Sequence, residues 1–171
     1  LKNLKSKNKI YPCYETKSEL DLKRKKQLNM GYPPIYDRTA LKLTPEDHKK
    51  FDDEGKKAHW RFLLDKKKIC WNDKIIGDVS IDLESLSDPV FVKEDGQFLY
   101  TLASVCDDID FCITHVIRGS DHLTNTATQI QLIQDLGSEV PIYGHHSLLI
   151  DTTGDNLSKR FGSLSIREIR N

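Results

Sequence analysis

Helical signals stand out near the start of the chain, where polar residues outnumber hydrophobic ones. Thr16-Lys17-Ser18-Glu19 has the form of a capping box and predicts a basic helix that runs to about Met30, with Gly31 as its end. Thr44-Pro45-Glu46-Asp47 predicts a second helix, because proline suits the first helical position and acidic residues suit the first turn. This helix should run to about Gly55.

Short apolar and aromatic clusters separated by charged turns fill residues 58–92. This pattern favours strands, and the clusters lie at 60–64, 69–71 and 79–81. Two further apolar segments, 90–92 and 98–100, flank Glu94-Asp95-Gly96, which predicts a hairpin.

Beyond residue 100 the pattern changes to strand, helix, strand. The apolar run 111–117 predicts a buried parallel strand, and the next strand should cover 142–150. Between them, 124–136 carries an apolar stripe at helical spacing, with Gly137 as the stop. A further capping box at 165–168 predicts another helix start. The chain therefore reads as an α/β protein with two lobes: a mixed α+β insertion at 11–88 and one half of a doubly wound sheet at 89–171.

Composition narrows the function classes. The 171 residues contain 26 Lys and Arg and 26 Asp and Glu, so the formal net charge is zero and affinity for RNA would depend on local patches. None of the four cysteines forms a C-x-x-C pair, which predicts reduced thiols in a cytoplasmic protein. No apolar run approaches the roughly 20 residues that cross a bilayer, so no membrane association is expected.

A polar loop near the C-terminus carries the most specific chemistry. It reads N-L-S-K-R from Asn156 to Arg160, and its adjacent Lys159 and Arg160 suit a triphosphate. The ammonium supplies a mobile point charge, the guanidinium a rigid fork, and the Ser158 hydroxyl a hydrogen bond. Taken alone, such a basic pair is more often solvated surface.

Arg118 follows a predicted buried strand, and open α/β sheets bind ligands at the carboxyl ends of their strands. A guanidinium there can pair with a carboxylate, although a surface salt bridge is an equally good interpretation of the residue alone. Tyr100 and Ser104 are four positions apart and would share one face of a helical turn.

Several segments, taken together and in this order, resemble the second half of the catalytic domain of bacterial glutamyl-tRNA synthetases, a family of class I aminoacyl-tRNA synthetases. N-L-S-K-R is similar to their lysine-bearing signature loop. The resemblance spans nearly the whole chain and is carried by the motifs at 10–14, 31–38, 87–96, 100–108, 116–129 and 156–160.

The resemblance implies that glutamate is activated with ATP and Mg²⁺ and then esterified to the 3′ end of tRNA(Glu). Lys159 and Arg160 would be the catalytic cations, and Leu157, Ser158, Lys159 and His122 would bind ATP. Tyr100, Ser104, Arg118 and Asp121 would bind glutamate, with Arg118 on its side-chain carboxylate. The sequence departs from the family's pattern at three places: Asn156 stands where a lysine is usual, Ser104 where asparagine is frequent, and His122 where some members carry an aromatic residue.

The resemblance also divides the chain. Residues 1–10 would end the first half of a Rossmann-like catalytic domain, 11–88 would be the insertion that binds the tRNA acceptor stem, and 89–171 would be the second catalytic half. The chain starts at Leu1 and has no H-I-G-H motif. We therefore expect an internal fragment of a monomeric enzyme, inactive alone, that lacks the H-I-G-H half and the anticodon-binding region.

The insertion offers candidate tRNA contacts. Arg38 and Arg61 would meet phosphates, and Tyr36 or Trp60 would stack on a base, although each is also an ordinary solvated or core residue. Related enzymes hold zinc from a C-x-C motif, whereas this chain has Cys13-Tyr14-Glu15, so no zinc or other protein-bound metal is expected.

Two alternatives remain open. One is the shorter paralogue that attaches glutamate to a modified tRNA base, a glutamyl-queuosine tRNA synthetase; the missing C-x-C argues against it. The other is a non-catalytic tRNA-binding module, which would have no need of the Lys159 loop or of Arg118 at a strand end. Whether tRNA(Gln) is also charged is not encoded in these residues.

Overall fold

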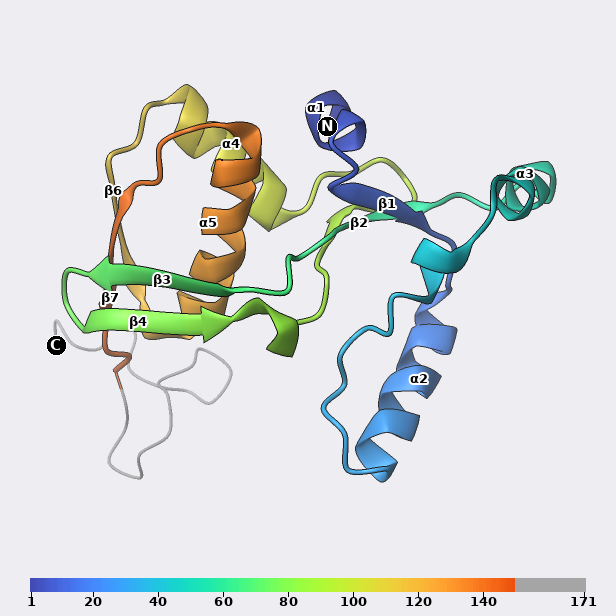
Figure 1. Ribbon diagram of the computed structural model, residues 1–171, viewed down its shortest axis with the longest axis horizontal. Coiled ribbons are helices and arrows are strands. Elements are labelled where there is room, and N and C mark those ends of the chain that lie inside the picture. Colours follow the sequence, from blue (N-terminus) through green and yellow to red (C-terminus); the bar gives the residue numbers. More distant parts are fainter. Residues whose placement is uncertain (150–171) are drawn as a thin grey trace, which may run out of the picture.

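The computed structural model describes residues 1–149, which fold into helices and short sheets around one main core (Figure 1). The helices are α1 (Lys2–Ser6), α2 (Lys17–Asn29), α3 (Pro45–Asp53), α4 (Tyr100–Asp110) and α5 (Leu123–Leu136), with 3-10 turns η1 (Thr39–Lys42), η2 (Leu83–Ser85) and η3 (Ser120–His122). The strands are β1 (Ile10–Cys13), β2 (His59–Phe62), β3 (Lys68–Asp73), β4 (Gly77–Asp82), β5 (Val90–Val92), β6 (His115–Gly119) and β7 (Ile142–His146).

Local capping signals set the helix boundaries. The Thr16 hydroxyl accepts a hydrogen bond from the Glu19 amide, and the Glu19 carboxylate accepts one from the Thr16 amide. Thr44 and Asp47 repeat this arrangement at α3, and Gly137 ends α5 with a φ of 82°. Of the four helices predicted from the sequence, the three that lie within residues 1–149 are therefore confirmed.

The strands form three small sheets. β1, β2 and β5 make an antiparallel sheet, β3 and β4 make an antiparallel hairpin, and β6 pairs with β7 in parallel. The parallel pair, with α5 as its crossover, is the described part of the α/β fold expected from the sequence.

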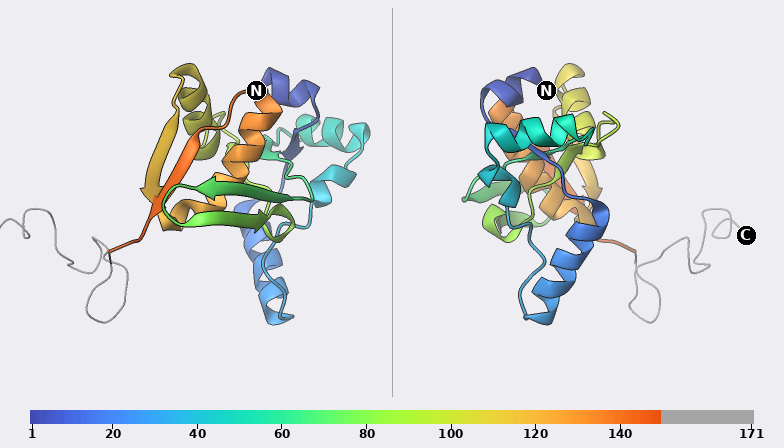
Figure 2. Two further views of the ribbon diagram at one scale, coloured as in Figure 1. Left: turned by 60° about the vertical axis from the view of Figure 1, so that its left-hand side comes forward. Right: turned by 90° about the vertical axis from the view of Figure 1, so that its right-hand side faces the viewer.

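The core joins segments from both predicted lobes. Phe62 and Phe91 stack with their ring centroids 4.7 Å apart, and both are fully buried. The β3–β4 hairpin packs on α5 and β7, as two views of the molecule show (Figure 1, Figure 2). The β1–β2–β5 sheet and this hairpin thus make contacts across the predicted boundary between residues 88 and 89. α2 extends away from this body and has no buried residue.

Three expected strands differ from the structure. The predicted strand 111–117 starts only at His115, because α4 continues to Asp110 and Cys112 turns the chain with a φ of 53°. β6 is also not buried, since Ile117 is 60% exposed. The hairpin at Glu94–Gly96 is reduced to one bridge between Val92 and Phe98, and Tyr100 already begins α4. The strand expected at 142–150 ends at His146. The helix expected from Ser165 lies outside the described residues.

Candidate functional site

Arg118 lies near the carboxyl end of β6, directly beside His145 of β7 in the parallel pair. Its Nη2 donates hydrogen bonds to the Thr126 hydroxyl and to Gln129 Oε1, the latter at 2.6 Å. Its Nε donates to His145 Nε2 at 3.4 Å. Within residues 1–149, its Nη1 donates to no protein acceptor, so one end of the guanidinium is available for a ligand.

Gln129 links Arg118 to helix α4. Its side chain is buried on α5, accepts from Arg118 through Oε1 and donates from Nε2 to the Ser104 hydroxyl at 3.0 Å. Both ends of the amide are satisfied, which fixes its orientation. Ser104, predicted to contact glutamate, is thereby tied to Arg118 through one buried side chain.

Tyr100 and His122 lie on the same side as Arg118. Tyr100 opens α4, His122 ends η3, and their ring centroids are 6.3 Å apart. The Asp121 carboxylate is half exposed and lies 3.8 Å from His122 Nε2. A Cβ on Gly119 would lie only 2.5 Å from Asp121 Oδ1, so a larger residue there would displace the Asp121 side chain. The structure therefore brings Tyr100, Ser104, Arg118, Asp121 and His122 to one end of the fold.

Two further ionisable groups surround Arg118. Burial raises the pKa of Asp108, against the opposing effect of the Arg118 guanidinium. Burial also raises the pKa of Tyr143 to about 12, again opposed by Arg118, whose guanidinium lies 5.3 Å from the tyrosine ring centroid. The arginine thus lies over the ring of the buried Tyr143 and has the Asp108 carboxyl group nearby.

His145 is held by a carboxylate from another part of the chain. Its Nδ1 is 2.5 Å from Asp73 Oδ2, and both side chains are completely buried. Asp73 Oδ1 also accepts from the backbone amides of Ile75, Ile76 and His145. This pair connects the β3–β4 hairpin to the strand beside Arg118.

In the segment predicted to be the insertion, Arg38 is paired with Asp88. Arg38 Nε and Nη2 donate to the two carboxylate oxygens of Asp88 at 2.8 Å and 2.7 Å, and Nη2 also donates to the Leu64 carbonyl. Asp88 is buried and also accepts from the Tyr11 hydroxyl at 2.6 Å. These contacts give Arg38 a structural role, and its contact with tRNA stays a prediction.

Arg61 is likewise built into the fold. It is 8% exposed, its Nη1 donates to the Asp88 carbonyl at 2.7 Å, and its guanidinium lies 4.2 Å from the Tyr36 ring centroid. Contact of Arg61 with tRNA also stays a prediction, and it would require this side chain to leave its buried position.

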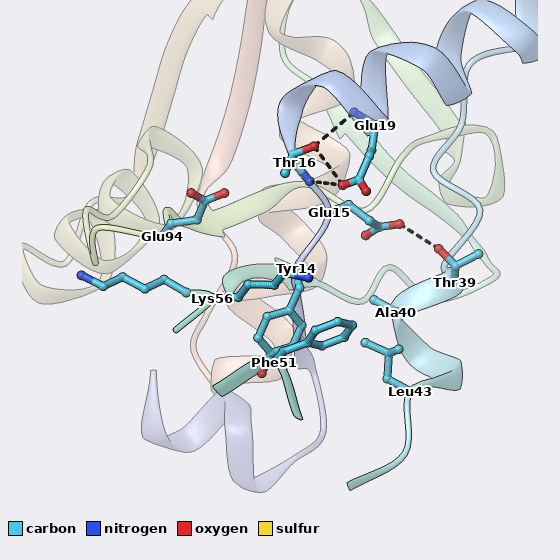
Figure 3. A pocket seen from close by; sticks show the side chains of 11 residues that line it. Tyr14, Glu15, Thr16, Glu19, Thr39, Ala40, Leu43, Phe51, Lys56 and Glu94 are labelled. Carbon is cyan, nitrogen blue, oxygen red and sulfur yellow. Dashed lines mark hydrogen bonds between the residues drawn. The ribbon is translucent and has the colours of Figure 1, made fainter. Parts of the chain in front are cut away.

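A cavity of about 520 Å³ lies apart from Arg118, between the start of α2, η1 and α3 (Figure 3). Tyr14 and Phe51 form its aromatic wall, with ring centroids 4.7 Å apart. Glu15 and Glu19 also line it, but their carboxylates already accept hydrogen bonds from Thr39 and Thr16. The cavity contains none of the residues that the sequence predicts for catalysis or substrate binding.

The described residues also bear on metal ligands and on helices that could span a membrane. Within residues 1–149, no group of three or more His, Cys, Asp or Glu side chains is arranged to hold a metal ion. The absence of bound zinc stays a prediction. In this part of the chain, no helix is both long and apolar enough to cross a bilayer.

Leu157, Ser158, Lys159 and Arg160 lie outside the described residues, so their roles remain sequence predictions.

Sequence reasoning missed the partners that hold Arg118. Thr126 and Gln129 occupy the buried face of α5, where two polar residues among apolar neighbours were the available signal. Asp73 gave no such signal, because its position in a charged turn resembles ordinary surface.

The chain matches the family model for class I tRNA synthetases (E and Q), catalytic domain, over residues 1–171. It is 57% identical over 167 residues to glutamate–tRNA ligase 1 of Paracoccus denitrificans, covering 98% of this chain and 38% of that protein. It is 56% identical over 169 residues to glutamate–tRNA ligase 1 of Parvibaculum lavamentivorans, with the same coverage. The chain thus spans 38% of the length of these relatives.

Solved structures of similar fold are also glutamate-tRNA synthetases. The glutamate-tRNA synthetase from Elizabethkingia anophelis superposes with a TM-score of 0.84 at 31% identity, over 94% of this chain and 34% of that one. A glutamate tRNA ligase from Elizabethkingia meningosepticum, solved in complex with its amino acid, gives a TM-score of 0.82 at 32% identity with the same coverage. This chain therefore belongs to the class I tRNA synthetases (E and Q) and lies within their catalytic domain.

Proposed function

We propose that this chain is part of a glutamate–tRNA ligase. In the first step, the α-carboxylate of glutamate attacks the α-phosphate of ATP, forming glutamyl-adenylate and releasing pyrophosphate. In the second, a ribose hydroxyl at the 3′ end of tRNA(Glu) attacks the activated carbonyl, and AMP leaves. The chain's share of this work is to bind the amino acid and the phosphates.

The guanidinium of Arg118 is the observation that carries the proposal. Its Nε and Nη2 are held from within the fold, while its Nη1 has no protein acceptor among residues 1–149. A fixed cation with free donors pairs strongly with a carboxylate. The side chain of glutamate supplies this carboxylate, and glutamine, which is neutral, would lose the charge-assisted bond.

The residues around Arg118 complete the proposed glutamate site. Tyr100 and Asp121 would contact the remainder of the amino acid, and His122, 6.3 Å from the Tyr100 ring, would lie between it and ATP. Ser104 would act mainly through Gln129, to which its hydroxyl is bonded. Its short side chain is consistent with this indirect role.

The phosphates would be bound by the loop 156–160. Negative charge builds on the phosphate oxygens as pyrophosphate leaves, and the Lys159 and Arg160 cations would stabilise it. Leu157 and Ser158 would support ATP in the same loop. Mg²⁺ would arrive with ATP and offset phosphate charge; because residues 1–149 offer no cluster of metal ligands, we assign it no protein ligand.

The insertion at 11–88 would approach the acceptor stem of tRNA(Glu), with Arg38 and Arg61 as the proposed contacts. We further propose that the protein acts as a cytoplasmic monomer. The division of the chain at residues 10 and 88 is part of the same proposal, with the β3–β4 hairpin attached to the catalytic half by its packing on β7.

ATP–pyrophosphate exchange by the full-length protein tests the function. Wild type should show exchange that requires glutamate, and the exchange rate is measured both with and without tRNA. Arg118→Ala should lose it by about 100-fold or more, because the charge-assisted pair is worth about 1.5–3 kcal/mol and the buried partners lose their donor as well. Arg24→Ala, an exposed arginine on α2, is the matched control and should behave as wild type.

Other outcomes would redirect the proposal. A folded protein that binds tRNA but shows no exchange would indicate a non-catalytic module. Glutamate attached to a tRNA base, not to the 3′ end, would indicate the shorter paralogue. Exchange that survives Arg118→Ala would contradict the assigned glutamate contact.

A further inference from the structure

The pairing of Asp73 with His145 determines what the imidazole presents to Arg118. A carboxylate can only accept, and Asp73 Oδ2 lies 2.5 Å from His145 Nδ1. We therefore assign the ring proton to Nδ1, which leaves Nε2 as an acceptor. That Nε2 lies 2.8 Å from the Thr126 hydroxyl and 3.4 Å from Arg118 Nε, which donates to it.

The opposite tautomer would be unfavourable here. With its proton on Nε2, the neutral ring would turn the Nδ1 lone pair towards the Asp73 carboxylate, and two acceptors would face each other in a buried space. The Nε2–H would also point towards the Nε–H of Arg118, which is a donor. The Thr126 hydroxyl accepts from Arg118 Nη2, and its one hydrogen lies within reach of two acceptors, His145 Nε2 at 2.8 Å and the His122 carbonyl at 3.1 Å. The orientation of the guanidinium therefore depends on an acceptor that Asp73, on a different strand, maintains.

We propose that Asp73 and His145 are positioning residues that hold Arg118 in the orientation needed to pair with the side-chain carboxylate of glutamate. The inference rests on the proposed function for its substrate, but the positioning itself is a property of the free protein. It gives the β3–β4 hairpin, which lies outside the predicted catalytic half, a part in substrate selection.

Asp73 also has a purely structural role, which the test must separate. Its Oδ1 accepts from three backbone amides, those of Ile75, Ile76 and His145. Asp73→Asn keeps an oxygen that can accept from these amides, and it places an NH₂ group against His145 Nδ1. The substitution also removes the acceptor of a long hydrogen bond from Trp71 Nε1 (3.4 Å). The reversed amide would leave three backbone donors unpaired, so this orientation is favoured. The histidine must then accept at Nδ1 and carry its proton on Nε2.

The experiment uses full-length protein with ¹⁵N-labelled histidine and arginine. In Asp73→Asn, the protonated ring nitrogen of His145 should change from Nδ1 to Nε2, and the Arg118 Nε–H resonance should shift. The KM for glutamate should rise about 10-fold or more, as expected for a lost hydrogen bond to a charged group, while the KM for ATP changes little. Asp78→Asn, an exposed position in the same hairpin, is the matched control and should change none of these.

A double-mutant comparison separates positioning from general destabilisation. In an Arg118→Ala background, Asp73→Asn should add no further loss, because its effect acts through Arg118. Thr126→Val is a second variant that leaves the Asp73–His145 pair intact and should also raise the KM for glutamate. If Asp73→Asn folds poorly, Thr126→Val still tests whether the partners of Arg118 set the KM for glutamate.

The proposal and the proposed function fail in different ways. Wild type that shows no glutamate-dependent exchange, while Asp73→Asn still shifts the Arg118 resonance, would overturn the function but support the positioning. An unchanged Arg118 resonance, an unchanged KM in a variant whose tautomer has reversed, or losses that add in the Arg118→Ala background would overturn the positioning.

Discussion

Arg38 and Asp88 form a two-pronged ion pair, with Nε and Nη2 of the arginine 2.8 Å and 2.7 Å from the two carboxylate oxygens. The carboxylate is fully buried and also accepts from the Tyr11 hydroxyl and the Leu64 amide. One side chain thus ties together the first strand, the loop before η1 and the segment after β2. Arg38, which the sequence predicts as a tRNA contact, is thus part of the folded framework of residues 11–88.

Removal of the Asp88 carboxylate should therefore destabilise the fold. Asp88→Ala leaves Arg38 and the Tyr11 hydroxyl without their buried partner, and we expect a loss of about 3–5 kcal/mol in the free energy of unfolding. Denaturant unfolding of the full-length protein measures it. Glu84→Ala, which breaks the exposed Lys66–Glu84 pair, should change stability by no more than about 1 kcal/mol. Equal effects for both variants would show that the Asp88 network is unimportant.

Gln129 and Gln131 are both buried on α5 but should have different roles. Gln129→Leu removes an acceptor from Arg118 and a donor from Ser104, so the KM for glutamate should rise about 10-fold. Gln131 instead bonds the Leu63 carbonyl and the Asp65 amide. Gln131→Leu should cost about 1–3 kcal/mol of stability and leave that KM unchanged. Exchange kinetics and unfolding curves of the two variants measure these effects. A raised KM for glutamate in Gln131→Leu, with an unchanged KM in Gln129→Leu, would contradict the assignment.

Acid should weaken the contribution of Asp73 to stability. Burial opposes ionisation of this carboxyl, but hydrogen bonds from the His145 ring and three backbone amides outweigh it and hold the pKa of Asp73 well below its usual range. A lowered folded-state pKa gives stability that is fully present above the unfolded-state pKa, near 3.9, and is lost as the pH falls through the folded-state value. The stability difference between wild type and Asp73→Asn should be largest near neutral pH and narrow below about pH 4. A difference that widens with acid would reverse the assigned sign.

Lys159 should act on the chemical step. Its ammonium would stabilise charge that develops on the phosphates, so Lys159→Ala should lower the kcat of pyrophosphate exchange by about 100- to 1,000-fold. The KM for glutamate should change little, because Arg118 selects the amino acid. Lys159→Arg should recover part of the rate, which separates charge from shape. An unchanged kcat in Lys159→Ala would contradict the catalytic role proposed for this residue.

The helices could be predicted from the amino-acid sequence, because their boundaries depend on neighbouring residues. The capping boxes at Thr16 and Thr44 and the glycine stop at Gly137 act within one turn, so their outcome is visible in a few adjacent letters. The motifs around Arg118 were also sufficient to indicate the family. The start of β6 was not determined locally, since the apolar residues Phe111 and Ile113 fit a strand but lie in the connection between α4 and β6.

The pairing of residues that are far apart in the chain, in contrast, depends on how the chain folds. Asp73 and His145 are 72 positions apart, and Arg38 and Asp88 are 50 apart, so no local pattern connects them. A buried charge is stable only when distant segments supply its hydrogen bonds, and the same arginine in water would look like a free cation. The sequence therefore identified Arg118 as a carboxylate-binding candidate, whereas the folded chain supplied the histidine, threonine and glutamine that orient it.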